Sequence, residues 1–265
     1  MEGCGFVPKS RNEEEESVRP TRLFIAAAVA VLAMAAVAIA QTTTYDIGGT
    51  VSVKGGSKKK PKPGTLSFNF SVSSPDGNQT PPIKTYSIMY EGGHINTNLI
   101  PGCTAAKINA ANGDDSDCPA ASRVGSGTIH ALIGSTGQPT SAASTCDGTL
   151  TLYNARGGHL ALFVKSELSS CPVALHQAID MKYVTSGDKA GVEFTVPDEL
   201  RHQVSLDITV QSASAKFTKI VKKKGKKKVG FIESTGCKDG KRDETVTFTD
   251  ETGQAFPVTK TLGAC

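Results

Sequence analysis

The densest group of chemically active side chains in this sequence is a run of lysines around Gly225. The run lies between two expected strands, so the pattern predicts a hairpin tip that gathers six ammonium groups within about 10–15 Å. Such a tip can bind an acidic wall polymer, a lipid headgroup or a glycosaminoglycan-like chain. The alternative is a solvated turn whose charges prevent strand edges from pairing with other chains. The candidate anion-binding residues are Lys222, Lys223, Lys224, Lys226, Lys227 and Lys228.

The basic residues do not point to nucleic acid. A second cluster, Lys58–Lys62, adds four lysines, but the net charge of the whole chain is only +4. No aromatic residue interleaves with the lysines, so neither cluster provides the stacking platform that binds single strands. We therefore expect an anionic surface polymer or lipid headgroups as partner, and no nucleic acid. The sequence leaves the oligomeric state unknown.

A short acidic loop, Asn112–Asp117, carries three aspartates between Cys103 and Cys118. Three carboxylates with backbone carbonyls could hold a calcium ion. The spacing matches no EF-hand loop, however, and the loop lacks the closing glutamate. A polar turn closed by a disulfide is therefore the favoured interpretation.

No residue pattern in the chain predicts catalysis. The five histidines occur singly, never at metal-ligand spacing, and neither GxSxG nor HExxH is present. The stretch Glu91–His94 could place a carboxylate near an imidazole, but Gly-Gly turns do this without chemistry. We predict no catalytic residue, no cofactor and no metal. A polysaccharide hydrolase that takes its carboxylates from separate strands would leave no local motif, so it remains the alternative.

Seven cysteines define the covalent framework, and six of them follow residue 40. This even set allows 15 connectivities. Pairing nearest neighbours would close loops of about 15 to 30 residues, each worth about 3 kcal/mol in the chain-entropy model. Because no CxxC and no Cys–His pair at zinc spacing occurs, disulfides are favoured over a metal site. The predicted disulfide residues are Cys103, Cys118, Cys146, Cys171, Cys237 and Cys265.

An uncharged apolar run, Leu23–Ala40, supplies the expected route out of the cytoplasm. It follows Arg19 and Arg22 and ends in small residues before Gln41, a pattern that a signal peptidase can cut. As a helix it would span about 27 Å, so an uncleaved transmembrane anchor is the alternative. We expect residues 1–22 to be a disordered cytoplasmic n-region and residues 41–265 to be extracellular or in the cell envelope.

The elements that must position these residues are strands. Thr65–Ser73 and Lys84–Glu91 alternate apolar and polar residues with period two, and turn residues recur every 8–14 positions. The absence of βαβ alternation argues against a nucleotide-binding α/β fold. Residues 41–64 read as a first strand with a Lys/Pro-rich loop, and residues 65–265 as a disulfide-stapled, all-β sandwich. Ala105–Ala111 is the one expected helix outside the leader.

One segment resembles a known group of proteins. Ile100-Pro101-Gly102-Cys103, followed by Cys118-Pro119 and the pattern CPxxSxVGxG through Gly127, is similar to uncharacterised secreted domains of high-GC Gram-positive bacteria. The resemblance implies an Ig-like or jelly-roll-like antiparallel β-sandwich and pairing of Cys103 with Cys118. It implies no activity and no functional residues.

These observations predict an exported, non-enzymatic cell-envelope or extracellular protein that contacts anionic surface polymers through its lysine-rich loops. The alternatives are the envelope polysaccharide hydrolase and a membrane-anchored assembly subunit, which would use an exposed apolar patch or an open strand edge.

Overall fold

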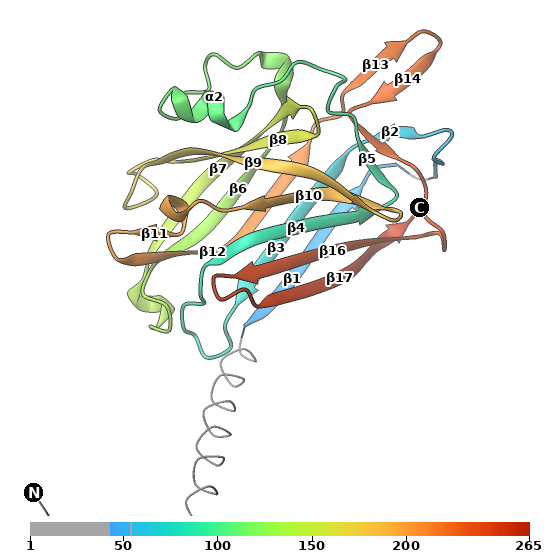
Figure 1. Ribbon diagram of the computed structural model, residues 1–265. Helices are drawn as coiled ribbons and strands as arrows, with labels where there is room; N and C mark the ends of the chain where they lie inside the picture. The colour runs from blue at the N-terminus through green and yellow to red at the C-terminus, as the bar shows by residue number, and fades with distance from the viewer. Residues whose placement is uncertain (1–42, 54) are drawn as a thin grey trace, which may run out of the picture. The chain divides into compact units, whose positions relative to one another are not determined.

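The computed structural model describes residues 43–53 and 55–265, and Thr43–Cys265 forms one compact unit. The predicted n-region and the predicted apolar signal or anchor segment, residues 1–22 and 23–40, lie outside the described residues. The described chain is almost entirely antiparallel sheet, which confirms the all-β prediction (Figure 1). Within this part of the chain, no helix is long and apolar enough to cross a membrane.

The strands vary in length from two to 13 residues. They are β1 Thr44–Val51, β2 Lys62–Gly64, β3 Leu66–Ser73, β4 Ile83–Glu91, β5 Gly93–Ile95, β6 Arg123–Gly134, β7 Ser144–Arg156, β8 His159–Ser166, β9 Leu175–Ser186, β10 Lys189–Thr195, β11 His202–Gln203, β12 Leu206–Phe217, β13 Val221–Lys224, β14 Lys227–Gly230, β15 Ile232–Ser234, β16 Lys241–Asp250 and β17 Ala255–Ala264. Helix α2 spans Ala105–Ala110, and three 3-10 turns span Ala120–Ser122, Thr140–Ala142 and Asp198–Leu200.

Twelve strands form one antiparallel sheet in the order β1-β3-β12-β6-β7-β8-β9-β10-β4-β16-β17, with β11 paired to β12. Strands β6 to β10 follow one another along the chain, and each pairs with its successor. Tight turns join β7 to β8 and β9 to β10, and longer loops join the other two pairs. The two ends of the sheet come from distant parts of the sequence. The path holds eleven strands and every pairing is antiparallel, so the edge strands β1 and β17 run in the same direction.

The sheet curls until these two edge strands lie side by side, as the blue and red strands in Figure 1 show. Tyr45 of β1 stacks on Phe256 of β17 at a centroid distance of 5.2 Å. Lys260 Nζ of β17 lies 3.2 Å from Asp46 Oδ1 of β1. Side chains therefore join the two edges near the start of β1.

The inner face of the curled sheet carries the main hydrophobic core. In β16 the residues alternate, so that Val246 and Phe248 are wholly buried while their neighbours are partly exposed. Phe248 lies edge-on to Phe70 of β3 and Tyr86 of β4, at centroid distances of 5.4 and 5.7 Å. Because β3 and β4 belong to opposite ends of the sheet, these aromatic rings hold the two halves together.

Two small sheets extend the unit at one end. Strands β2, β15 and β5 form one of them, and β13 and β14 form the projecting hairpin at the upper right of Figure 1. Strand β12 runs unbroken through a polar stretch. The polar stretch after Val210 is a β-bulge, marked by a register shift between Val210 and Ser212, and it does not end the strand.

All six predicted cysteines form disulfides. The pairs are Cys103–Cys118, Cys146–Cys171 and Cys237–Cys265. The first is the pair implied by the resemblance. In all three pairs, each cysteine is bonded to its nearest neighbour among the six along the chain. Disulfides of this number are typical of an oxidising, extracellular environment. The third pair ties the end of β17 to the loop before β16, so the chain terminus is held covalently.

We expect alkylation of the native protein to leave these six thiols unmodified until the disulfides are reduced. Peptide mapping by mass spectrometry without reduction should then show three cross-linked peptides, one for each nearest-neighbour pair. Alkylation of any of the six without reduction, or a cross-linked peptide joining two different pairs, would contradict the framework.

Candidate functional site

The lysine run folds into the predicted hairpin. Strands β13 and β14 pair antiparallel, and a two-residue turn joins them at Gly225 and Lys226. Gly225 has a φ of 63°, a backbone conformation that costs glycine little and disfavours other residues. All six predicted lysines are exposed. Among the residues that the structure describes, no acidic side chain forms an ion pair with any of the six.

The register of this hairpin places like charges directly across from one another. Lys223 faces Lys228, and Lys224 faces Lys227. Opposed Cα atoms in an antiparallel pair lie about 4.5–5.5 Å apart, and like charges in that position destabilise the pair by about 0.2–1 kcal/mol. An isolated two-stranded hairpin is itself only marginally stable. Repulsion between the opposed lysines therefore destabilises the hairpin that carries them.

The structure brings the second basic cluster next to the first. Strand β2 begins at Lys62, an exposed residue, and lies against β14, where Pro63 contacts the backbone of Gly230. The hydrogen bond from Lys238, whose Nζ lies 3.3 Å from Asp188 Oδ2, lowers the pKa of Asp188, and the charge of Lys58 contributes less. The β13–β14 hairpin therefore lies next to the strand that begins at the end of the second basic cluster.

Two of the three aspartates in the acidic loop have hydrogen-bond partners nearby. Asp114 Oδ1 accepts a hydrogen bond from the backbone N–H of Ser116, and the hydroxyl of Tyr153 donates to Asp115 Oδ2. Lys107 Nζ donates to the backbone carbonyl of Asp117. The Cys103–Cys118 disulfide closes the loop, as expected for a polar turn.

The histidines lie in separate places on the sheet. His130 and His159 each face an aspartate on the neighbouring strand, Asp147 at 2.6 Å and Asp180 at 2.9 Å. His94, in the stretch weighed for catalysis, contacts Tyr183 Oη and Asn96 Oδ1, whereas Glu91 accepts from the backbone N–H of Lys238. Glu91 and His94 therefore do not form a hydrogen-bonded pair.

Sequence reasoning missed one convergence of titratable groups. Asp198, His202 and Glu251 bring ligand atoms within 4.8 Å of one another. Arg201 lies among them, with Nη2 at 2.6 Å from Asp198 Oδ1 and a second ion pair to Glu251. The guanidinium already supplies the positive charge that a metal ion would bring, so this is an ion-pair network. Glu251 lies far along the chain from the others, and no local pattern could have indicated the contact.

The interior of the curled sheet holds an apolar cavity of about 160 Å³. Its lining is almost entirely aliphatic and aromatic, and its polar residues are Tyr90, His94, Ser166, Ser214, Glu233 and Arg242. One carboxylate, that of Glu233, lines this cavity, and its two oxygens accept hydrogen bonds from Gly230 N and Asn96 Nδ2. This is not the paired-carboxylate cleft that a glycosidase needs.

Comparison with known proteins gives no match: no protein-family model, no curated protein and no solved structure is similar to this chain.

Proposed function

We propose that this protein is exported and acts without catalysis in the cell envelope or extracellular space, where the lysine hairpin binds anionic surface polymers. The observation that carries the proposal is the opposition of Lys223 to Lys228 and of Lys224 to Lys227. A bound polyanion would neutralise this repulsion, so the binding energy would offset a cost that the free hairpin retains. A turn that served only to prevent strand edges from pairing with other chains would need only a few scattered charges.

Further features support the same function. The hairpin projects from one end of the unit, where a polymer chain can reach it from several sides (Figure 1). The three disulfides suit an oxidising compartment. The finer fold assignment, an Ig-like or jelly-roll-like sandwich of the secreted group described above, also belongs to this proposal. It rests on the resemblance of the CPxxSxVGxG segment.

The two alternative functions have less support. A hydrolase needs two carboxylates in one cleft, whereas the interior cavity has one. An assembly subunit needs an apolar contact surface. Val204 and Leu206 are 89% and 39% exposed around the β11–β12 turn, but two side chains fall short of the few hundred Å² that marks such a surface.

We expect the triple substitution Lys223→Gln, Lys226→Gln and Lys227→Gln to weaken retention on a polyanion by at least about tenfold, because each lysine near an anionic surface contributes about 1 kcal/mol. Binding should be measured on immobilised heparin and on phosphatidylglycerol vesicles over a range of salt concentrations. Heparin tests the polymer, and the vesicles test the lipid headgroup. Retention should fall as salt rises, since salt screens exposed charges.

The matched control is the substitution of three exposed lysines elsewhere, Lys84, Lys182 and Lys216, by glutamine. Both triple variants lower the net charge equally, so only the place of the charge differs. If the two variants lost retention equally, net charge and not the hairpin would explain binding. If neither variant nor salt changed retention, the proposed function would be wrong.

A further inference from the structure

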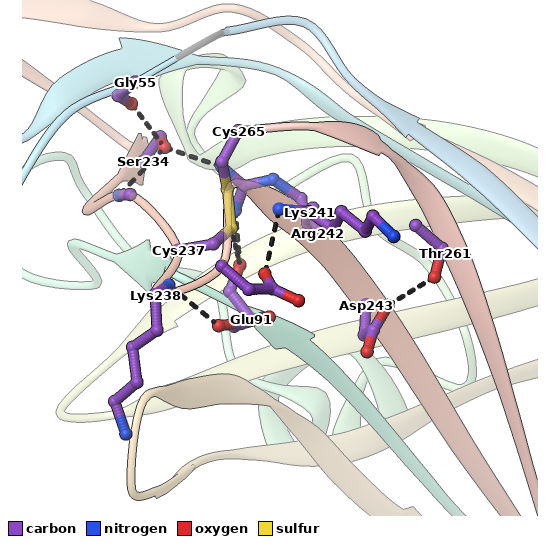
Figure 2. Close-up of a disulfide and its surroundings, with 12 residues drawn as sticks. Gly55, Glu91, Ser234, Cys237, Lys238, Lys241, Arg242, Asp243, Thr261 and Cys265 are labelled. Atoms are coloured by element: carbon purple, nitrogen blue, oxygen red, sulfur yellow. Dashed lines mark hydrogen bonds between the residues drawn. A yellow bond between two sulfur atoms is a disulfide. The ribbon is translucent and has the colours of Figure 1, made fainter.

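The lining of the interior cavity contains a buried cation, Arg242 of β16, which is 2% exposed. No carboxylate oxygen among the described residues lies within ion-pair distance of it; burial lowers its pKa, and the charge of Glu91 offsets part of this effect. Nη1 donates to the backbone carbonyl of Glu91, and Nη2 donates to Ser234 Oγ at 2.7 Å. Figure 2 shows these contacts beside the Cys237–Cys265 disulfide. Nε has no hydrogen-bond partner.

Tyr90 of β4 presents a second unpartnered donor to the same cavity. Its side chain is 5% exposed, and its hydroxyl makes no hydrogen bond of good geometry among the described residues, although burial and the neighbouring Glu244 carboxyl raise its pKa. Tyr90 is directly opposite Glu244 in the register of β4 with β16, so Arg242 is its diagonal neighbour on the inner face. Diagonal neighbours lie about 7–8 Å apart, a distance that long side chains bridge.

Leaving such groups unpaired in the interior is costly. A buried donor without an acceptor costs about 1–3 kcal/mol, and a charged one costs more. A bound molecule could supply the acceptor, and Arg242 is the one lysine or arginine among the cavity-lining residues. A carboxylate would satisfy the free Nε–H, the hydroxyl of Tyr90 and the charge of the guanidinium together.

The size of the cavity limits the rest of the ligand. A dry, apolar cavity of about 150 Å³ binds benzene, and this cavity measures about 160 Å³. Aromatic and aliphatic side chains such as Phe68, Leu150 and Ile179 line its larger part. That part suits a ring or a chain of about six carbons, with no further polar group.

We propose that the interior cavity binds a small apolar carboxylate, with its hydrocarbon part among the apolar side chains and its carboxylate against Arg242 and Tyr90. The site is separate from the lysine hairpin and does not depend on the proposed function. Its chemistry selects an anion with a single charged end, whereas the hairpin selects a polymer with many charges.

Isothermal titration of the full, disulfide-bonded chain with benzoate and with benzene tests the proposal. The assay is best run at about pH 6, where benzoate is ionised and where neighbouring Glu244, whose pKa burial raises to about 7, is mostly neutral. Both probes should bind, and benzoate should bind more tightly. Binding of neither probe, or of benzene alone, would overturn the proposal.

Tyr90→Phe is the decisive variant, because it removes a single hydroxyl, whose one neighbouring acceptor is the Glu244 carboxyl, and keeps the buried ring, so the protein should fold normally. We expect Tyr90→Phe to bind benzoate about tenfold more weakly, because one hydrogen bond to a charged group is lost. Its binding of benzene should be unchanged. Tyr153→Phe, which lies outside the cavity lining, is the matched control and should change neither. Ala131→Leu fills the cavity and should abolish both. Unchanged benzoate binding in Tyr90→Phe would contradict the placement of the carboxylate.

Discussion

Replacing Glu244 by glutamine is expected to raise the free energy of unfolding by about 3–4 kcal/mol at pH 8 and to leave it nearly unchanged at pH 4. Glu244 is wholly buried on the inner face of β16, and neither carboxylate oxygen has a hydrogen-bond partner among the described residues. Burial raises the pKa of this carboxyl to about 7, while Tyr90 and Lys260 lower it slightly. The ordinary value in an unfolded chain is about 4.5.

The direction of the effect follows from proton linkage. Between about pH 4.5 and 7 the folded protein keeps the proton on Glu244 and the unfolded chain has lost it. Stability therefore falls as the pH rises through this window, by about 1.4 kcal/mol for each unit. Below the window both states are protonated, so the penalty is absent. Above it the penalty is complete, and glutamine, which carries no charge, removes it.

Urea unfolding of the wild type and of Glu244→Gln at several pH values between 4 and 8 measures this difference directly. Groups common to both proteins, including the five histidines, cancel in the subtraction. Glu233→Gln is the matched control. Glu233 is also buried, but Gly230 N and Asn96 Nδ2 donate to its oxygens, so glutamine should destabilise the protein there. A difference between wild type and Glu244→Gln that stays constant with pH would contradict a buried carboxyl with a raised pKa.

The position of Glu244 also shows what the sequence could have revealed. In β16 the residues Arg242, Glu244, Val246 and Phe248 alternate with partly exposed neighbours, and all four point inward. Period-two alternation therefore contained the signal that two charged residues share a face with the core.

Local patterns predicted the elements better than their arrangement. The alternation in Thr65–Ser73 and the central glycine of the lysine run led directly to β3 and to the β13–β14 hairpin. The order of the sheet has no such local signal, because β4 pairs with β10 and β16, which lie about 100 and 150 residues further along the chain. The interior cavity depends on that arrangement, so no sequence pattern indicated it.

Phe248→Ala is expected to lower the free energy of unfolding by about 3–5 kcal/mol, the usual cost of removing a wholly buried phenylalanine. Phe248 is 0% exposed and contacts Phe70, Tyr86 and Tyr45, which come from β3, β4 and β1. Its ring therefore joins strands from both ends of the curled sheet. The cavity left by alanine would remove contacts on all these strands at once.

Phe256→Ala provides a matched control, since both phenylalanines stack on Tyr45, at centroid distances of 4.6 and 5.2 Å. Phe256 lies on the edge strand β17 and is only partly buried, so its truncation should cost about 1 kcal/mol. Hydrogen exchange adds a local measurement: Phe248→Ala should speed exchange of backbone amides in β1 and β17 more than in β7 and β8, which lie at the centre of the sheet. Equal losses for the two variants would mean that the stack on Tyr45, and not the buried ring between the two halves, holds the seam closed.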